Sequence, residues 1–219
     1  MRQNVSLAEI SDGHLYKAND MVKADCGGCE GCSQCCRGMG ISIILDPYDV
    51  YRLTTGIGKS MQELLATSVE LNVVDGVILP NLKMQGTREA CAYLDTEGRC
   101  SIPPYRPGIC RLFPLGRHYE NGGLFYFLQT GECAKENRSK VKVSKWIDTP
   151  ELKRNEQFKL QWHDLLSAMT DRVAGEDEGK QREENLLLLR LFYLLPYEGT
   201  TDFYSQFTER MEHWNEQIG

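Results

Sequence analysis

The sequence lacks a long apolar run. Its longest apolar stretch, from Leu186 to Leu195, is interrupted by Arg190, whereas a helix that crosses a bilayer needs about 20 apolar residues. The first residues, from Met1 to Ile10, also lack the continuous apolar segment of a signal peptide. These absences predict a cytoplasmic protein with no membrane partner.

Basic clusters are missing as well. The formal net charge is -6, the isoelectric point is near 5.3, and no run rich in Lys and Arg accompanies the cysteines. A protein that binds nucleic acid usually carries a basic surface that neutralises phosphates. The composition therefore predicts no nucleic-acid partner, and the sequence names no protein partner.

Known catalytic patterns are also absent. No Ser-His-Asp arrangement or pair of carboxylates is placed for hydrolysis, and the four histidines are scattered along the chain. The segment from Gly56 to Ser60 resembles the end of a phosphate-binding loop, but Leu53 stands where that loop requires its first glycine. The sequence therefore leaves any catalytic residue unknown.

Cysteine is abundant, but only in the first part of the chain. Five of the nine cysteines form the run Cys26-Gly-Gly-Cys29-Glu-Gly-Cys32-Ser-Gln-Cys35-Cys36, and the others are Cys91, Cys100, Cys110 and Cys133. A Cys-x-x-Cys turn brings two sulfurs toward one point. In a reducing cytosol such spacing indicates metal binding or redox chemistry rather than disulfides. Soft thiolates favour zinc, copper(I) or iron with sulfide over magnesium or calcium.

The adjacent pair Cys35 and Cys36 bears on the number of centres. Neighbouring residues of an extended segment point in opposite directions, so we expect this pair to serve two metals or a polynuclear site. Eight thiolates suffice for two zinc sites or two iron-sulfur clusters. The run from Cys26 to Cys35 follows the first steps of a ferredoxin-type run but lacks its proline. The cofactor is thus zinc or iron, with an iron-sulfur cluster slightly favoured.

Two long motifs resemble a known family. The motif CxxCxxCC falls on Cys29, Cys32, Cys35 and Cys36, and the second motif falls on Cys91, Cys100, Arg106, Pro107, Cys110, Arg111, Phe113 and Pro114, with Cys133 as the last cysteine. Together they resemble the CxxCxxCC cysteine cluster family, described as a zinc- or iron-chelating domain. The resemblance implies that the metal ligands are Cys29, Cys32, Cys35, Cys36, Cys91, Cys100, Cys110 and Cys133.

Cys26 departs from the family pattern. It adds one Cys-x-x step before the first family cysteine, so it is either an extra ligand or a thiol without metal. Arg106 and Arg111 flank Cys110, and their guanidinium groups can either donate hydrogen bonds to thiolates as second-shell residues or face solvent.

The resemblance leaves the reaction open. Flagellin lysine N-methylases carry a similar cysteine motif, which implies an iron-sulfur-dependent protein-modifying enzyme as one alternative. The chain shows no glycine-rich loop between a strand and a helix of the kind that usually holds a methyl donor. A metal-binding protein without an assigned reaction is the main interpretation, and metal trafficking or buffering is a further alternative.

The pattern of elements predicts an α+β fold. We expect an N-terminal tail or helix over residues 1–24, a loop-rich cysteine cluster domain with short strands and helices over 25–138, and a helical C-terminal region over 139–219. Short strands are predicted at Ile41–Leu45, Val77–Leu79, Ala92–Leu94 and Leu124–Gln129.

Helix signals are clearer. Asp46 and Pro47 predict a helix that ends near Gly56, and the capping pattern of Ser60 and Glu63 predicts another that reaches about Leu71. After Thr149-Pro150 the apolar residues recur with a helical period. This pattern predicts three helices whose apolar stripes form a packed core. The stripe of the first helix consists of Phe158, Trp162, Leu165, Met169 and Val173, and that of the third consists of Phe203, Phe207, Met211 and Trp214. The second helix spans about Lys180 to Leu195.

Overall fold

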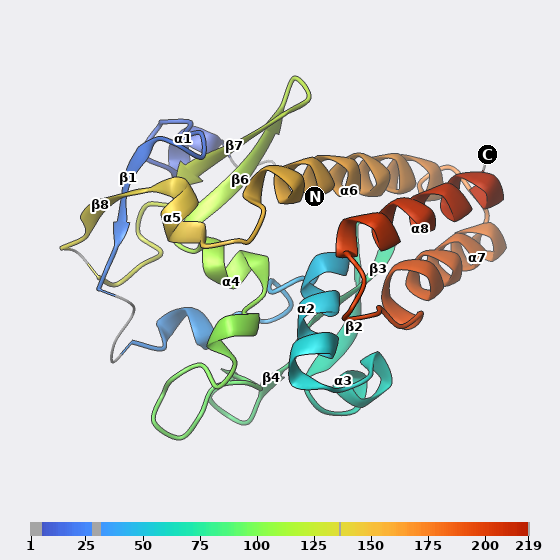
Figure 1. The fold of residues 1–219 in the computed structure, drawn as a ribbon, viewed down its shortest axis with the longest axis horizontal. Coiled ribbons are helices and arrows are strands. Elements are labelled where there is room, and N and C mark those ends of the chain that lie inside the picture. Colours follow the sequence, from blue (N-terminus) through green and yellow to red (C-terminus); the bar gives the residue numbers. More distant parts are fainter. Residues whose placement is uncertain (1–5, 28–31, 136, 219) are drawn as a thin grey trace.

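The computed structural model describes residues 6–27, 32–135 and 137–218. It is a mixed α+β fold in which long C-terminal helices lie on one side, and short strands and helices lie on the other (Figure 1). The elements before the C-terminal helices are α1 (Leu7–Ile10), β1 (Met21–Asp25), η1 (Gln34–Cys36), α2 (Pro47–Ile57), α3 (Met61–Thr67), β2 (Val69–Val74), β3 (Val77–Leu82), β4 (Met84–Gln85), β5 (Ala90–Cys91), η2 (Pro103–Tyr105), α4 (Gly108–Leu112), β6 (Leu115–Glu120), β7 (Gly123–Leu128), β8 (Ser139–Lys142) and α5 (Val143–Ile147).

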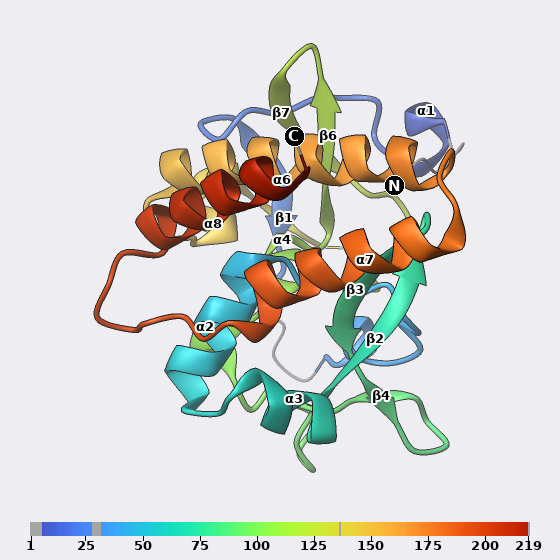
Figure 2. The ribbon, with the colours of Figure 1, turned by 90° about the vertical axis from the view of Figure 1, so that its right-hand side faces the viewer.

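The C-terminal helices are α6 (Leu152–Val173), α7 (Glu178–Leu189) and α8 (Phe203–Ile218), and a π-helical turn, η3 (Arg190–Leu194), continues α7. Figure 2 shows them crossing above α2, α3 and the hairpin of β2 and β3. No helix in the described ranges is long and apolar enough to cross a membrane.

Strands in the described part of the chain pair two by two, all antiparallel: β1 with β8, β2 with β3, β4 with β5, and β6 with β7. Three of these pairs are short-range, but β1 and β8 lie more than a hundred residues apart in the sequence. Asp75 and Gly76 both have positive φ angles in the β2–β3 turn, as a tight hairpin turn requires. The pairs therefore act as separate small ribbons between which loops are held.

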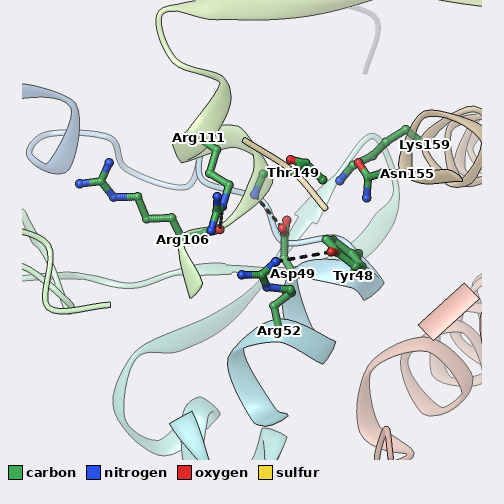
Figure 3. Close-up of a pocket in the computed structure, with 9 residues that line it drawn as sticks. Tyr48, Asp49, Arg52, Arg106, Arg111, Thr149, Asn155 and Lys159 are labelled. Atoms are coloured by element: carbon green, nitrogen blue, oxygen red, sulfur yellow. Dashed lines mark hydrogen bonds between the residues drawn. The ribbon is translucent and has the colours of Figure 1, made fainter. Parts of the chain in front are cut away.

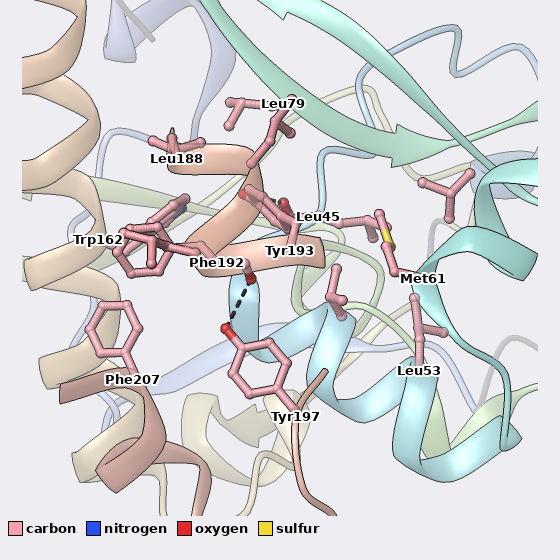
Figure 4. Close-up of a cluster of buried hydrophobic side chains, with 14 of the residues drawn as sticks. Leu45, Leu53, Met61, Leu79, Trp162, Leu188, Phe192, Tyr193, Tyr197 and Phe207 are labelled. Atoms are coloured by element: carbon pink, nitrogen blue, oxygen red, sulfur yellow. Dashed lines mark hydrogen bonds between the residues drawn. The ribbon is translucent and has the colours of Figure 1, made fainter. Parts of the chain in front are cut away.

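The main core joins the C-terminal helices to the cysteine region (Figure 4). Phe192 and Leu188 from the helices and Leu45 and Leu53 from α2 and its approach are fully buried in the same cluster. The apolar stripes predicted for α6 and α8 are confirmed: every residue of both stripes is buried in this core or, in the case of Met211, partly buried against it. The boundary proposed near residue 138 stays a prediction.

A second, smaller core lies under β1, β6, β7 and α5. It contains Val22, Ala24, Leu112, Leu115, Tyr126, Leu128, Val143 and Ile147. The Tyr126 hydroxyl donates to Glu156 Oε1 at 2.9 Å, which ties this core to α6. Leu112 is the last residue of α4, so both cores meet at the helix that carries Cys110.

Local signals placed α2 correctly. Asp46 accepts from the Asp49 amide and Asp49 accepts from the Asp46 amide, a reciprocal capping box, with Pro47 at the first helical position. The helix continues through Gly56 to Ile57 and ends at Gly58 in the left-handed region. The predicted end was therefore slightly early.

Three strand and helix predictions were wrong. Helix α3 ends at Thr67 rather than near Leu71, because the six residues of β2, Val69–Val74, pair with β3 and bury Val69. Ile41–Leu45 forms only an isolated bridge, at Ile44, instead of a strand. The turn that ends at Ser42 and the helix cap at Asp46 leave too few residues between them for a longer ladder. Ala92 and Tyr93 form the turn after β5, and Leu94 makes only an isolated bridge with Cys100, so no strand forms there.

The remaining strand predictions hold. The predicted strand at Val77–Leu79 is confirmed within β3, and the one at Leu124–Gln129 is confirmed as β7, which runs from Gly123 to Leu128. The second C-terminal helix is confirmed as α7 with η3. Local alternation and turn residues were sufficient where a tight hairpin joins the two strands.

Candidate metal centre

Cys35 and Cys36 lie in the 3-10 turn η1, not in an extended segment. The expectation that their side chains point in opposite directions was wrong, because successive residues of a 3-10 helix are separated by about 120°. The Cys35 thiol is hydrogen-bonded to Cys36, which raises the pKa of Cys35 and lowers the pKa of Cys36. The two thiols therefore form a hydrogen-bonded contact pair.

Two further cysteines lie near this pair: Cys91 in β5, and Cys100 in the segment that follows β5. Cys91 pairs with Met84 in the β4–β5 ribbon, and Cys100 returns to form a bridge with Leu94. A bridge between Arg37 and Ala90 ties the end of η1 to β5. Residues more than fifty positions apart in the sequence are thus fixed side by side by backbone hydrogen bonds.

Cys110 lies on the short helix α4, which α2 positions. Asp49, only 3% exposed, accepts a hydrogen bond from the Gly108 amide at 2.7 Å (Figure 3). A side chain on Gly108 would come within 3.1 Å of Arg117 Nη2 and 3.3 Å of Lys159 Nζ. The glycine of the Arg-Pro-Gly segment therefore leaves space for a buried charged network that anchors the start of α4.

Sequence reasoning missed this network. Lys159 is buried on α6 and forms an ion pair with Asp46, while Asp49 faces Arg117 from β6. The Asp46-x-x-Asp49 spacing predicts a helix cap, but it carries no signal for the second bond that Asp49 makes to Gly108. Only the packing of α2, α4 and α6 against one another brings these charges together.

Four cysteines form what we call the inner cysteine group: Cys36, Cys91, Cys100 and Cys110. Burial raises the pKa of Cys110, and the neighbouring groups Cys91, Asp49, Cys35 and Cys100 raise it further. Burial likewise raises the pKa of Cys91, with Cys100 and Cys35 adding to the effect. The thiols of Cys91, Cys100 and Cys110 also pack against the main hydrophobic core. The four thiols of the inner group are therefore near enough to affect one another's pKa, and three of them pack against the main core.

A second set, the outer cysteine group, lines a pocket beside η1. Its members are Cys26, Cys32, Cys35 and Cys133, and the apolar walls include Phe113, Pro114 and Trp146. The Trp146 indole is fixed by hydrogen bonds from Nε1 to the carbonyls of Leu112 and Phe113, at 3.3 and 3.2 Å. Cys35 belongs to this pocket and also contacts Cys36, so the two groups meet at the adjacent pair.

One predicted ligand, Cys29, lies outside the described residues. Among the residues that are described, no disulfide joins Cys32, Cys35, Cys36, Cys91, Cys100, Cys110 and Cys133. Within the same ranges, no three His, Cys, Asp or Glu side chains stand in an arrangement ready to hold a metal ion. The donor chemistry nevertheless fits a soft metal, because both groups offer sulfur rather than the oxygen ligands that magnesium and calcium require.

The two arginines beside Cys110 occupy different surroundings. The Arg106 guanidinium is close enough to Cys35 to oppose the rise of its pKa. Arg111 instead donates to the carbonyls of Arg106, Pro104 and Asp148. A second-shell role stays a prediction for both, and the charge of Arg106 is the one that faces the thiols.

Comparison with known proteins gives one match. Residues 28–139 match the family CxxCxxCC, whose description is "Putative zinc- or iron-chelating domain". Cys26 lies just outside the matched segment. No curated protein and no solved structure matches the chain. Because the matched segment covers half of the chain and includes the predicted ligands of both cysteine groups, this protein belongs to the CxxCxxCC family of metal-chelating domains.

Proposed function

We propose that this protein holds iron in two adjoining thiolate centres, and that these are iron-sulfur clusters rather than zinc sites. The inner centre takes Cys36, Cys91, Cys100 and Cys110 as its ligands. The outer centre takes Cys32, Cys35 and Cys133, and its remaining thiol comes from Cys29 or Cys26. The observation that carries this proposal is the division of the thiols into two groups that meet at the contact pair of Cys35 and Cys36.

The choice of iron-sulfur over zinc is supported by two features. The first part of the cysteine run repeats the spacing of ferredoxin-type runs. Cys91, Cys100 and Cys110 of the inner group pack against the main hydrophobic core, and burial away from water is one of the properties that tune the potential of a cluster. We place the protein in the cytosol, where thiols stay reduced and available for metal.

The test is the composition of the anaerobically purified full-length protein. We expect each chain to contain enough iron and acid-labile sulfide for about two clusters, and we expect a broad visible absorption that bleaches on reduction. A folded protein that contains stoichiometric zinc and no sulfide would refute the iron-sulfur assignment. A folded protein without any bound metal would refute metal binding itself.

The division into two centres is tested with matched cysteine substitutions. Cys91→Ser should remove the inner centre and Cys133→Ser the outer one, so each variant should keep about half of the iron and sulfide. Cys26→Ser decides the last outer ligand: full content assigns Cys29, and half content assigns Cys26. Complete loss of metal in both Cys91→Ser and Cys133→Ser, with the fold retained, would show one polynuclear site instead of two centres.

A metal-trafficking role makes a different prediction. Thiolates packed on an apolar core should release their metal slowly to a chelator, because the folded chain must open to expose them. We therefore expect transfer to a strong chelator to take hours. Transfer within seconds, with the fold intact, would favour trafficking or buffering.

A further inference from the structure

The β2–β3 hairpin (Figure 2) has one covered edge and one open edge. At the outer edge of β3, the Leu45 amide donates to the Pro80 carbonyl at 2.8 Å. Beside it, the Leu82 amide donates to the Ile43 carbonyl at 3.0 Å. Within the described ranges, β2 pairs with no strand besides β3. The open edge of the hairpin is therefore the outer side of β2.

The backbone groups of two β2 residues point out from this open edge. In the antiparallel register, Leu71 lies opposite Pro80 and Val73 lies opposite Ile78. The Pro80 carbonyl and the Ile78 amide both form hydrogen bonds on the side away from β2, so these two pairs are of the non-hydrogen-bonded kind. The N–H and C=O groups of Leu71 and Val73 therefore face away from β3. Among the described residues, they form no backbone hydrogen bond with another segment.

The exposed side chains of β2 beside this edge are apolar. Leu71 is 41% exposed and Val73 is 66% exposed, and both lie on one face of the strand. The polar side chains lie on the other face, where Asn72 donates to Asn81 Oδ1 and Asn81 donates to Glu70 Oε1. The polar groups of β2 are thus bonded within the hairpin, and an apolar pair is left exposed.

Strand β2 lacks the features that usually keep an edge strand from pairing. Monomeric proteins protect such strands with lysine, proline or a bulge. The strand β2 contains neither lysine nor proline, and its register with β3 has no bulge. Strand β8, in contrast, carries the exposed lysines Lys140 and Lys142. A regular, apolar and open edge of this kind points to a partner strand.

We propose that β2 pairs with β2 of a second copy of this chain, antiparallel and centred on Asn72. In this register Leu71 lies opposite Val73 of the second copy, and the twofold axis repeats the pair. The outward N–H and C=O groups of both residues then bond across the interface, as in any antiparallel ladder. The two hairpins become one continuous four-stranded sheet, and the exposed apolar side chains cover one another.

The charges of β2 suit pairing with a second copy. In the proposed register Glu70 lies opposite Val74 of the second copy, and Asp75 lies opposite Val69. Like charges, which destabilise a sheet when they lie opposite one another, therefore do not meet. The assembly closes as a dimer because the other edge of each hairpin is already covered. No cysteine lies on β2 or β3, so this inference does not depend on which metal the cysteines hold.

The test is the mass of the metal-loaded full-length protein, kept anaerobic, measured by sedimentation equilibrium over a range of concentrations. We expect a dimer with a dissociation constant of roughly 10–100 μM, because the paired edge is short. The Leu71 and Val73 amides should exchange with solvent more slowly in concentrated than in dilute protein. A mass of one chain up to about 1 mM would overturn the proposal, as would a dimer in which these two amides exchange at the same rate as in the monomer.

Two matched variants test the register. The first, Leu71→Glu with Val73→Lys, places opposite charges across from each other in the proposed dimer. The second, Leu71→Lys with Val73→Lys, places lysines across from each other. Both replace the same two exposed residues, and we expect the first variant to dimerise about tenfold more tightly than the second. Leu186→Lys, at an exposed apolar position on α7, is the control and should dimerise like the wild type.

Equal dimerisation of the two matched variants would overturn the proposed register. A dimer of unchanged affinity in the second variant, or an equal loss in the control, would place the interface elsewhere and overturn the proposal. Circular dichroism, together with iron and sulfide content, verifies on the same samples that each variant keeps its fold and its metal. A protein without metal that still dimerises through β2 would refute only the metal proposal.

Discussion

Gly56 in α2 has no side chain because the ring of Tyr105 occupies the space where one would lie. A Cβ at this position would fall 2.2 Å from Cε1, 2.3 Å from Cδ1 and 2.7 Å from Cζ of Tyr105. Glycine inside a helix is ordinarily a cost, so its presence here is explained by this close approach. The contact presses η2, the turn that leads into the Cys110 loop, against α2.

Gly56→Ala therefore sets two effects against each other. Alanine stabilises a helix interior by about 0.5–1 kcal/mol relative to glycine. Forcing a methyl group into an aromatic ring costs about 1–3 kcal/mol, because the ring cannot yield without moving η2. We expect the steric cost to win and the free energy of unfolding to fall by about 1–2 kcal/mol.

A double-mutant cycle isolates the steric part. In a Tyr105→Ala background the ring is gone, so Gly56→Ala should raise the free energy of unfolding by up to about 1 kcal/mol. The effect of the same substitution thus changes sign between the two backgrounds, with a coupling of about 2–3 kcal/mol. Gly175→Ala, after the end of α6, where the nearest atom is the Arg172 carbonyl oxygen at 3.7 Å, is the control and should not destabilise.

The measurement is equilibrium urea unfolding followed by circular dichroism, with all variants in the same metal-loaded state because bound metal adds to stability. A Gly56→Ala protein more stable than the wild type with Tyr105 present would refute the reasoning. So would an equal effect of the substitution in both backgrounds. Either result would mean that the ring does not rest on the helix backbone.

Three further predictions concern the cores and the buried charges. Phe192→Ala, at a fully buried position, should lower the free energy of unfolding by about 3–5 kcal/mol in the same urea assay; a loss below about 1 kcal/mol would argue against the core assignment. Tyr126→Phe removes the hydrogen bond to Glu156 and should cost about 1.5–3 kcal/mol, whereas an unchanged midpoint would show that this bond does not dock α6. Burial raises the pKa of Asp49 from 3.8 to about 6, so the folded chain holds this proton more tightly than the unfolded chain does. That contribution is complete below about pH 4 and is lost as the pH rises through 6, an effect of roughly 3 kcal/mol. The stability of the wild type relative to Asp49→Asn, measured with chelator present, should therefore fall between pH 4 and pH 7, and a difference independent of pH would contradict the burial of this carboxylate.

Patterns carried by neighbouring residues were predictable from the sequence. The cap formed by Asp46 and Asp49 and the turn at Asp75-Gly76 need only a few consecutive residues, so their sequence signals are complete in themselves. The apolar stripe of α6 was equally readable, because burial of one helical face imposes a period of about 3.6 residues. The end of α3 was not predictable in this way, because the residues of β2 that follow it are held by hydrogen bonds to another strand, β3.

The candidate site was predictable in its donors but not in its arrangement. The cysteine spacing named the thiols, and the family match over residues 28–139 agrees with zinc or iron chelation. The expected opposition of Cys35 and Cys36 failed, because η1 is a 3-10 turn in which the two sulfurs touch. The ligand set itself remains a prediction to be tested by substitution.

The sequence by itself determined the sulfur chemistry, the helix starts and the apolar faces, since each depends on residue type and short-range spacing. Only the tertiary structure decided that the thiols gather in two groups meeting at Cys35 and Cys36, and that Asp49 caps the helix of Cys110. It also decided that Lys159, buried on α6, pairs with Asp46 at the start of α2. These arrangements depend on the packing of α2, α4 and α6 around shared cores, a long-range contact that spacing along the chain does not encode.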